Sequence, residues 1–162
     1  MTSSPMPPLL DELALAVGAT HVLTGDAIPP QHCTDWFQTH THRPLALVRP
    51  GTPEEVARVM AICHRHRQPV TPQGGLTGLV AGATPNEGDV ALSLARLNGL
   101  EEIDTAASTL TVLAGTPLQV AQEVARAAGL LLVVDLGARG SCQVGGNIAT
   151  NAGGNRVIRY GM

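Results

Sequence analysis

A stretch of small residues near the end of the chain has the composition of a ligand-binding loop. Residues 145–154 run Gly-Gly-Asn-Ile-Ala-Thr-Asn-Ala-Gly-Gly. Glycine adds no packing and raises the entropy cost of order, so this composition does not suit a core element. It suits a backbone that approaches a ligand closely and offers N–H groups to an anion. An isolated stretch of this kind is more often a solvent loop with glycines at its turns.

A second glycine cluster lies upstream, at residues 72–79, with the sequence Pro-Gln-Gly-Gly-Leu-Thr-Gly-Leu. It follows a short apolar run, Val70-Thr71, that we interpret as a strand. Open α/β sheets place phosphates where a strand opens into a glycine-rich turn. The cluster is neither a mononucleotide P-loop, which closes with Gly-Lys-Ser/Thr, nor the dinucleotide Gly-x-Gly-x-x-Gly. By itself it is a weak signal for phosphate binding.

Histidines and cysteines do not form a metal site in the sequence. His40 and His42 are two residues apart, with no cysteine or carboxylate cluster beside them, so we interpret them as surface residues. His64 and His66 fit the solvated last turn of a helix. Cys63 falls on the buried face of that helix, which favours a packing role over a reactive thiol.

Composition limits the class of protein. The chain has 162 residues, enough for one domain, and 44% of them are hydrophobic. Its net charge of −3 gives no reason to expect nucleic acid or an anionic membrane as partner. No apolar run reaches the ~18 residues that cross a bilayer, so no membrane insertion is expected. The three cysteines are far apart, form no Cys-x-x-Cys pair and favour a reducing cytoplasm: Cys33, Cys63 and Cys142.

The first half of the chain is predicted to contain a β-α-β unit. Residues 1–8 are expected to be frayed, residues 9–17 form a helix, and residues 19–44 are irregular. A buried strand over 45–48 leads to a helix with Thr52 as its cap, Pro53 in its first position and Glu55 closing a capping box. The expected apolar face of this helix comprises Val56, Val59, Met60 and Cys63.

The second half repeats part of this pattern. Strands are predicted over 90–94 and 109–114, with a strand or turn over 97–103 between them. Thr116-Pro117 resembles the earlier helix start, and the helix after it ends at Gly129, followed by a buried strand over 130–134. The buried face of that helix is predicted to comprise Leu118, Ala121, Val124 or Ala125, and Ala128. This repetition is compatible with internal duplication or with convergent capping chemistry, and both glycine clusters can converge on one extended ligand.

Both clusters, with Asp-Leu-Gly-Ala-Arg-Gly-Ser-Cys at 135–142 and Arg-Val-Ile-Arg-Tyr-Gly at 156–161, closely resemble a known family. This family is the FAD-binding domain of D-2-hydroxyglutarate dehydrogenases, which are flavoproteins of the vanillyl-alcohol oxidase/p-cresol methylhydroxylase type. D-lactate dehydrogenases and glycolate oxidases are near relatives. The resemblance covers residues 43–162, leaving 1–42 as an N-terminal helix and arm. Two positions depart from it: Leu76 where asparagine is usual, and Asn155 where leucine is usual.

The resemblance implies an α+β fold with β-α-β units and a non-covalent FAD. Gly74, Gly75, Thr77 and Gly78 would hold the diphosphate, and Leu76 leaves no histidine there for a covalent bond to flavin. The other residues expected at the cofactor are Pro72, Gln73, Leu79, Asp135, Gly140, Ser141, Gly145, Gly146, Asn147, Thr150, Asn151, Gly153, Gly154 and Tyr160.

In this family the catalytic base, the cations for the substrate and any metal ligands lie in a C-terminal cap domain. We therefore expect this chain to be the N-terminal part of the FAD domain, to lack the cap and to contain no catalytic residue. The activity implied is oxidation of a D-2-hydroxy acid to a 2-oxo acid, with D-2-hydroxyglutarate favoured, D-lactate or glycolate as alternatives, and an unknown electron acceptor. The alternative is a catalytically inactive fragment that binds a nucleotide weakly or serves a partner chain. Unpaired sheet edges would also allow a homo-oligomer.

Overall fold

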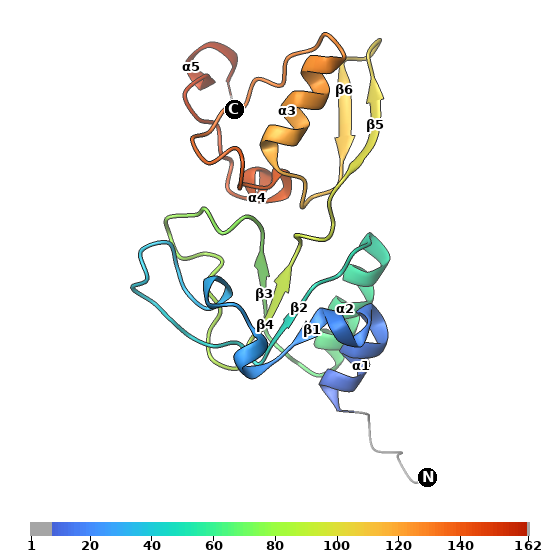
Figure 1. The fold of residues 1–162 in the computed structure, drawn as a ribbon, viewed down its shortest axis with the longest axis vertical. Coiled ribbons are helices and arrows are strands. Elements are labelled where there is room, and N and C mark those ends of the chain that lie inside the picture. Colours follow the sequence, from blue (N-terminus) through green and yellow to red (C-terminus); the bar gives the residue numbers. More distant parts are fainter. Residues whose placement is uncertain (1–7, 162) are drawn as a thin grey trace.

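The first lobe is built on a four-stranded sheet of short apolar strands (Figure 1). The computed structural model describes residues 8–161, so most of the stretch expected to be frayed lies outside the described residues. The sheet has the order β1 (Val22–Leu23), β2 (Ala46–Val48), β4 (Val90–Ser93) and β3 (Val70–Gln73). Strands β2, β4 and β3 are parallel, and β1 is antiparallel to β2. The parallel strands end at one edge, where open α/β sheets bind ligands.

Both faces of this sheet are covered, which explains why β2 and β4 are buried at every residue. Helices α1 (Leu9–Val17) and α2 (Pro53–Arg65) cover one face through side chains such as Leu13 and Val59. The irregular arm covers the other face by packing Ile28 and Cys33 against Leu47. The arm over 19–44 was expected to be irregular throughout. That prediction is wrong at residues 22–23, which pair with β2 as β1.

The predicted first β-α-β unit, β2-α2-β3, is confirmed, although β4 lies between the two strands in the sheet. The helix face differs at one position, because Met60 is 44% exposed and Ile62 is buried in its place. The buried residues of α2 are Val59, Ile62 and Cys63, spaced at i, i+3 and i+4, and Met60 lies beside that stripe. Burial raises the pKa of the Cys63 thiol, in keeping with its predicted packing role.

The predicted cap of α2 is confirmed. The Thr52 hydroxyl accepts a hydrogen bond from the Glu55 backbone N–H at 3.2 Å. The Glu55 carboxylate reaches one residue further back than in a standard capping box and accepts from the Gly51 N–H at 2.7 Å. Two of the free N–H groups at the chain's entry into α2 are thereby satisfied.

Removing this cap should destabilise the first lobe. We expect Thr52→Ala to lower the free energy of unfolding by about 1 kcal/mol, because the Glu55 N–H loses its acceptor. Thr52→Ser keeps the hydroxyl and should stay within about 0.5 kcal/mol of the parent chain. Urea unfolding followed by circular dichroism measures both variants, and equal stability of the two would contradict the assignment of this cap.

The second lobe has a different topology from the predicted repeat (Figure 1). Strands β5 (Leu100–Asp104) and β6 (Thr109–Val112) form a separate antiparallel pair, followed by α3 (Leu118–Ala127), α4 (Val144–Ala149) and α5 (Val157–Tyr160). The predicted strand over 130–134 is wrong, since this segment pairs with no strand of the described chain and Leu131 is 60% exposed. No second parallel β-α-β unit forms within residues 8–161, so the structure does not support internal duplication.

The start of α3 also differs from its prediction. Pro117 is the N-terminal cap, and no side chain caps the helix. Thr116 is buried, and its hydroxyl accepts from the Gly99 N–H at 3.0 Å and lies 3.2 Å from the Gly99 carbonyl. The Thr116 hydroxyl therefore bonds a distant backbone partner, whereas the hydroxyl of Thr52 caps α2 in the first lobe. The buried face is confirmed at Leu118, Ala121 and Ala125.

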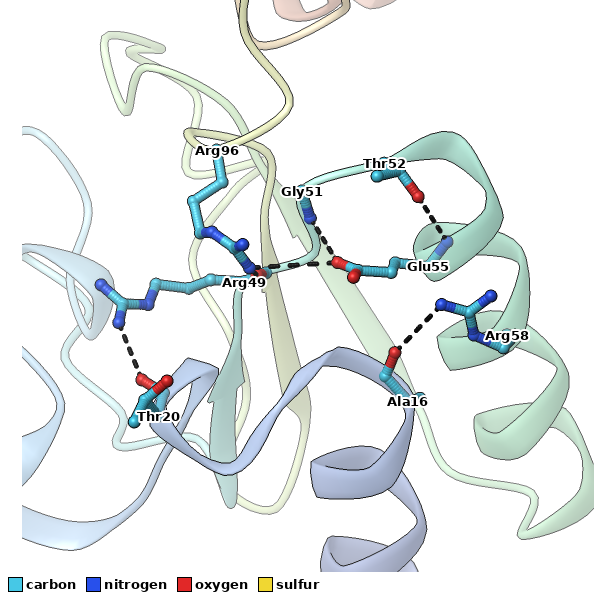
Figure 2. Close-up of polar contacts among 8 residues, drawn as sticks. All are labelled: Ala16, Thr20, Arg49, Gly51, Thr52, Glu55, Arg58 and Arg96. Atoms are coloured by element: carbon cyan, nitrogen blue, oxygen red, sulfur yellow. Dashed lines mark hydrogen bonds and ion pairs between the residues drawn. The ribbon is translucent and has the colours of Figure 1, made fainter.

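A polar junction ties the connector between the lobes to the first lobe (Figure 2). Arg96, in the segment between β4 and β5, donates to the Arg49 carbonyl at 2.6 Å and lies 3.9 Å from the Glu55 carboxylate. Arg49 in turn donates to the Thr20 carbonyl at 3.0 Å. The junction thus joins the end of β2, the start of α2 and the connector, and so fixes where the second lobe begins.

The predicted surface position of the histidines is confirmed at His40, His42 and His64, which are exposed. Within residues 8–161, no three His, Cys, Asp or Glu side chains form a group that could hold a metal ion. His66 is not simply solvated, because its ring contacts the Glu12 carboxylate at 2.8 Å and so links α2 to α1. No helix among the described residues combines the length and apolar character needed to span a membrane.

Candidate functional site

The two glycine clusters meet at the edge where the parallel strands end. A Cβ atom added to Gly75 would lie 2.0 Å from the Ser141 carbonyl oxygen and 2.8 Å from Cys142 Cα. A Cβ added to Gly74 would lie 3.4 Å from Gln143 Oε1 and 3.9 Å from Gly146 Cα. Backbones can approach this closely only where a side chain is absent, so Gly75 is required for the contact. Segments 66 residues apart in the sequence (75 and 141) thereby form one site.

The loop over 74–83 presents a row of unused backbone donors. Among the described residues, no oxygen accepts a hydrogen bond from the backbone N–H groups of this loop, and none of its residues is proline. Fully buried Gln73 holds the ends of the loop together, because its Nε2 donates to the Ala83 carbonyl at 2.9 Å and to the His32 carbonyl at 3.0 Å. Its Oε1 also contacts His32 Nδ1 at 2.7 Å. Free N–H groups on a fixed loop are the donors that bind a phosphate without a cation.

Hydrogen bonds to the segment before α3 hold the second cluster in place. Gly145 N–H donates to the Ala114 carbonyl at 2.8 Å, and Val144 N–H donates to the Thr116 carbonyl at 2.9 Å. A Cβ added to Gly145 would lie 2.8 Å from Ala114 Cβ, which explains why glycine stands there. The stretch expected to be one loop therefore begins as the short helix α4, and these hydrogen bonds fix the orientation of the helix.

One buried polar atom at the meeting point has no partner. Gln143 is 8% exposed, and its Oε1 makes no hydrogen bond with any described residue. An unsatisfied buried amide oxygen costs about 1–3 kcal/mol, so it indicates a donor supplied by a ligand. Gln143 was not among the predicted site residues. Its position beside Gly74 depends on the tertiary fold, and no local sequence pattern indicates it.

Asp135 and Gly154, both predicted at the cofactor, meet elsewhere in the second lobe. They form a parallel bridge, and a Cβ on Gly154 would lie 1.8 Å from the Asp135 carbonyl oxygen. Two arginines hold the carboxylate of Asp135, Arg139 at 3.0 Å and Arg156 at 3.3 Å. The hydrogen bond from Arg139 and the charge of Arg156 lower the pKa of Asp135. The side chain of Asp135 therefore joins its own segment, which includes Arg139, to the segment that contains Arg156.

This ion pair should make the second lobe sensitive to acid. A carboxyl with a lowered pKa adds stability above its ordinary pKa and loses it as the pH falls through the lowered value. We expect Asp135→Asn to lower the melting temperature at pH 7, and the difference from the parent chain to vanish in acid. Thermal unfolding over a pH series measures this, and a difference independent of pH would contradict it. Asp104→Asn, at the exposed end of β5, is the control.

The remaining predicted residues are distributed around the meeting point. Pro72 lies within β3, one residue before its end at Gln73, and Gly78 and Leu79 lie in the exposed part of the loop with the unused donors. Thr150 and Asn151 follow α4 and are exposed. The structure groups Tyr160 differently, because it lines a hollow with Leu131, Asn155 and Ile158, on the helix α5 that Figure 1 shows far from β3. The other predicted residues lie within the two clusters or beside them: Leu76, Thr77, Gly140, Asn147 and Gly153.

The profile of the FAD-binding domain family matches residues 44–162. The chain belongs to this family of FAD-binding domains. It is 46% identical over 154 residues to a D-2-hydroxyglutarate dehydrogenase of Xanthomonas citri pv. viticola, covering 95% of this chain and 33% of that protein. It is 41% identical over 133 residues to the mitochondrial D-2-hydroxyglutarate dehydrogenase of Bos taurus, covering 82% of this chain and 24% of that protein. The chain thus spans a third or less of the length of these relatives.

Solved structures confirm the predicted fold type. An alkyldihydroxyacetonephosphate synthase superposes with a TM-score of 0.85 at 19% identity, covering 99% of this chain and 32% of that one. A p-cresol methylhydroxylase superposes with a TM-score of 0.70 at 21% identity, covering 88% of this chain and 28% of that one. The chain therefore has the mixed α/β fold of p-cresol methylhydroxylase-type FAD-binding domains.

The residues at the meeting point fit FAD. The chain has no lysine, yet the loop over 74–83 supplies neutral N–H donors for a diphosphate. The unpartnered Gln143 oxygen supplies an acceptor beside that loop, and FAD carries hydroxyl donors on both sides of its diphosphate. Donors and acceptor thus match the two kinds of polar group in this cofactor.

Proposed function

We propose that this chain binds FAD non-covalently and forms the cofactor-binding part of a flavoenzyme that oxidises a D-2-hydroxy acid, with D-2-hydroxyglutarate favoured. The observation that carries the proposal is the set of unused backbone donors over 74–83 beside the second glycine cluster. When bound, FAD supplies the hydride acceptor for the oxidation, which yields a 2-oxo acid. The proposed substrate is supported by the two relatives described above, which are named as D-2-hydroxyglutarate dehydrogenases.

The chain's own residues would bind and orient the cofactor. Backbone N–H groups of Gly74, Gly75 and Thr77 would hold the diphosphate, and Gln143 would accept from a hydroxyl beside it. These donors are fixed by Gln73 and by the contact of Gly75 with Ser141, so binding requires little reorganisation. Leu76 has no group that forms a bond to flavin, which supports non-covalent binding.

The visible spectrum of the purified chain, followed by FAD titration monitored by flavin fluorescence, tests this proposal. Saturable binding near one FAD per chain, with all flavin released into the supernatant by acid precipitation, is expected. Flavin that stays with the precipitated protein would contradict non-covalent binding. No saturation at any FAD concentration would overturn cofactor binding by this chain.

Turnover of D-2-hydroxyglutarate, D-lactate and glycolate with an artificial electron acceptor then tests the substrate class. Highest activity with D-2-hydroxyglutarate is expected of the protein that contains this segment. FAD binding by this chain without turnover of any of the three would favour the alternative, a nucleotide-binding module without activity. Cytoplasmic location and self-association stay predictions.

A further inference from the structure

A hollow borders the first glycine cluster at Leu76. This hollow, the arm pocket, has a volume of about 550 Å³ and lies between the arm over 28–43 and Leu76. Its apolar lining includes Ile28 and Cys33, which are buried, and Trp36, which is 60% exposed. Leu76 belongs to both the arm pocket and the donor loop, so the two are continuous.

The exposed Trp36 lies on an ordered turn. The Asp35 carboxylate accepts from Thr39 N–H at 2.7 Å and from His40 N–H at 3.0 Å, and Thr34 bridges to Thr41 across the turn. Tryptophan buries a large area when it binds, so exposure of the chain's single tryptophan on a fixed turn indicates a ligand surface.

The arm is also held against the donor loop. Gln73 joins both through His32, and Arg43, which lines the pocket, forms an ion pair with Asp26 at 2.5 Å. The other charged residue of the lining, Asp35, accepts hydrogen bonds from within its own turn. Both charged groups thus have partners in the fold, and the apolar part of the lining is formed by residues such as Ile28, Trp36 and Leu76. A volume in this range with an apolar lining suits a flat ring system.

We propose that the arm pocket receives one of the two aromatic ring systems of FAD, with Trp36 packed against the ring. The inference rests on the proposed function, because the diphosphate must lie on the loop over 74–83. FAD is longer than this loop, so its rings extend past either side of the diphosphate. Leu76 leads from the donors directly into the arm pocket, which places a ring there. Isoalloxazine and adenine share the required chemistry.

Calorimetric titration of Trp36→Ala, Trp36→Phe and Phe37→Ala tests the proposal. Phe37 is the matched control, since it is adjacent, 61% exposed and absent from the pocket lining. We expect Trp36→Ala to weaken FAD binding about 10-fold, Trp36→Phe to restore most of the affinity, and Phe37→Ala to change it less than about 2-fold. Inorganic diphosphate should bind all variants equally. If Trp36→Ala weakens the binding of FMN but not of ADP, the ring in the pocket is isoalloxazine. If it weakens the binding of ADP but not of FMN, the ring is adenine.

Two outcomes overturn the pocket assignment while leaving the proposed function intact. One is FAD binding to Trp36→Ala with the affinity of the parent chain. The other is equal weakening by Trp36→Ala and Phe37→Ala, which would show a general effect on the arm. If the parent chain itself binds no FAD, the proposed function fails, and the pocket assignment fails with it.

Discussion

Gly75→Ala is expected to weaken FAD binding by at least about 100-fold. The added Cβ would lie 2.0 Å from the Ser141 carbonyl oxygen, 2.8 Å from its carbonyl carbon and 2.8 Å from Cys142 Cα. All three are backbone atoms, so no side-chain rotation relieves the overlap and the two clusters must separate. Overpacking of this kind costs about 1–3 kcal/mol or more, and about 2.7 kcal/mol corresponds to 100-fold.

The control for this prediction is Gly82→Ala, in the same loop. No atom lies within 4 Å of a Cβ built on Gly82, and its φ is outside the left-handed range, so the FAD affinity of this variant should change less than about 2-fold. FAD titration by flavin fluorescence measures both variants, and circular dichroism checks that each is folded. Folded Gly75→Ala with parental affinity would show that contact between the clusters is not needed for the site.

Replacing each of the two buried glutamines by leucine is expected to change stability in opposite directions. Gln73 makes three hydrogen bonds, so Gln73→Leu leaves the His32 and Ala83 carbonyls unpaired and should lower the free energy of unfolding by about 2–4 kcal/mol. Gln143→Leu removes an oxygen that has no partner, so in the absence of FAD it should raise the free energy of unfolding by about 1 kcal/mol.

The same Gln143→Leu variant is expected to bind FAD about 10-fold more weakly, because its oxygen no longer accepts from the cofactor. Higher stability with lower affinity is a combination that a purely structural role does not produce. Urea unfolding without FAD and fluorescence titration with FAD measure the two effects. Unchanged FAD affinity of Gln143→Leu would remove Gln143 from the site, and loss of stability would show that its oxygen is satisfied within the fold.

Local chemistry determined the parts of the fold that the sequence predicted correctly. The helix over 9–17, the cap at Thr52 and the strands β2, β3 and β4 depend on neighbouring residues and on apolar runs. Prediction failed where a distant partner decides the outcome. Thr116 repeats the pattern of Thr52, but its hydroxyl bonds Gly99, and the apolar run over 130–134 finds no strand to pair with among the described residues.

The sequence by itself determined which residues form the two glycine clusters, because only glycine allows close backbone approach and free donors at those positions. The tertiary structure alone decided that Gly75 lies against Ser141, that Gln143 is buried without a partner, and that Trp36 faces a pocket ending at Leu76. These contacts join segments far apart in the chain. No local pattern encodes such pairs, since they depend on where the connector after β4 places the second lobe.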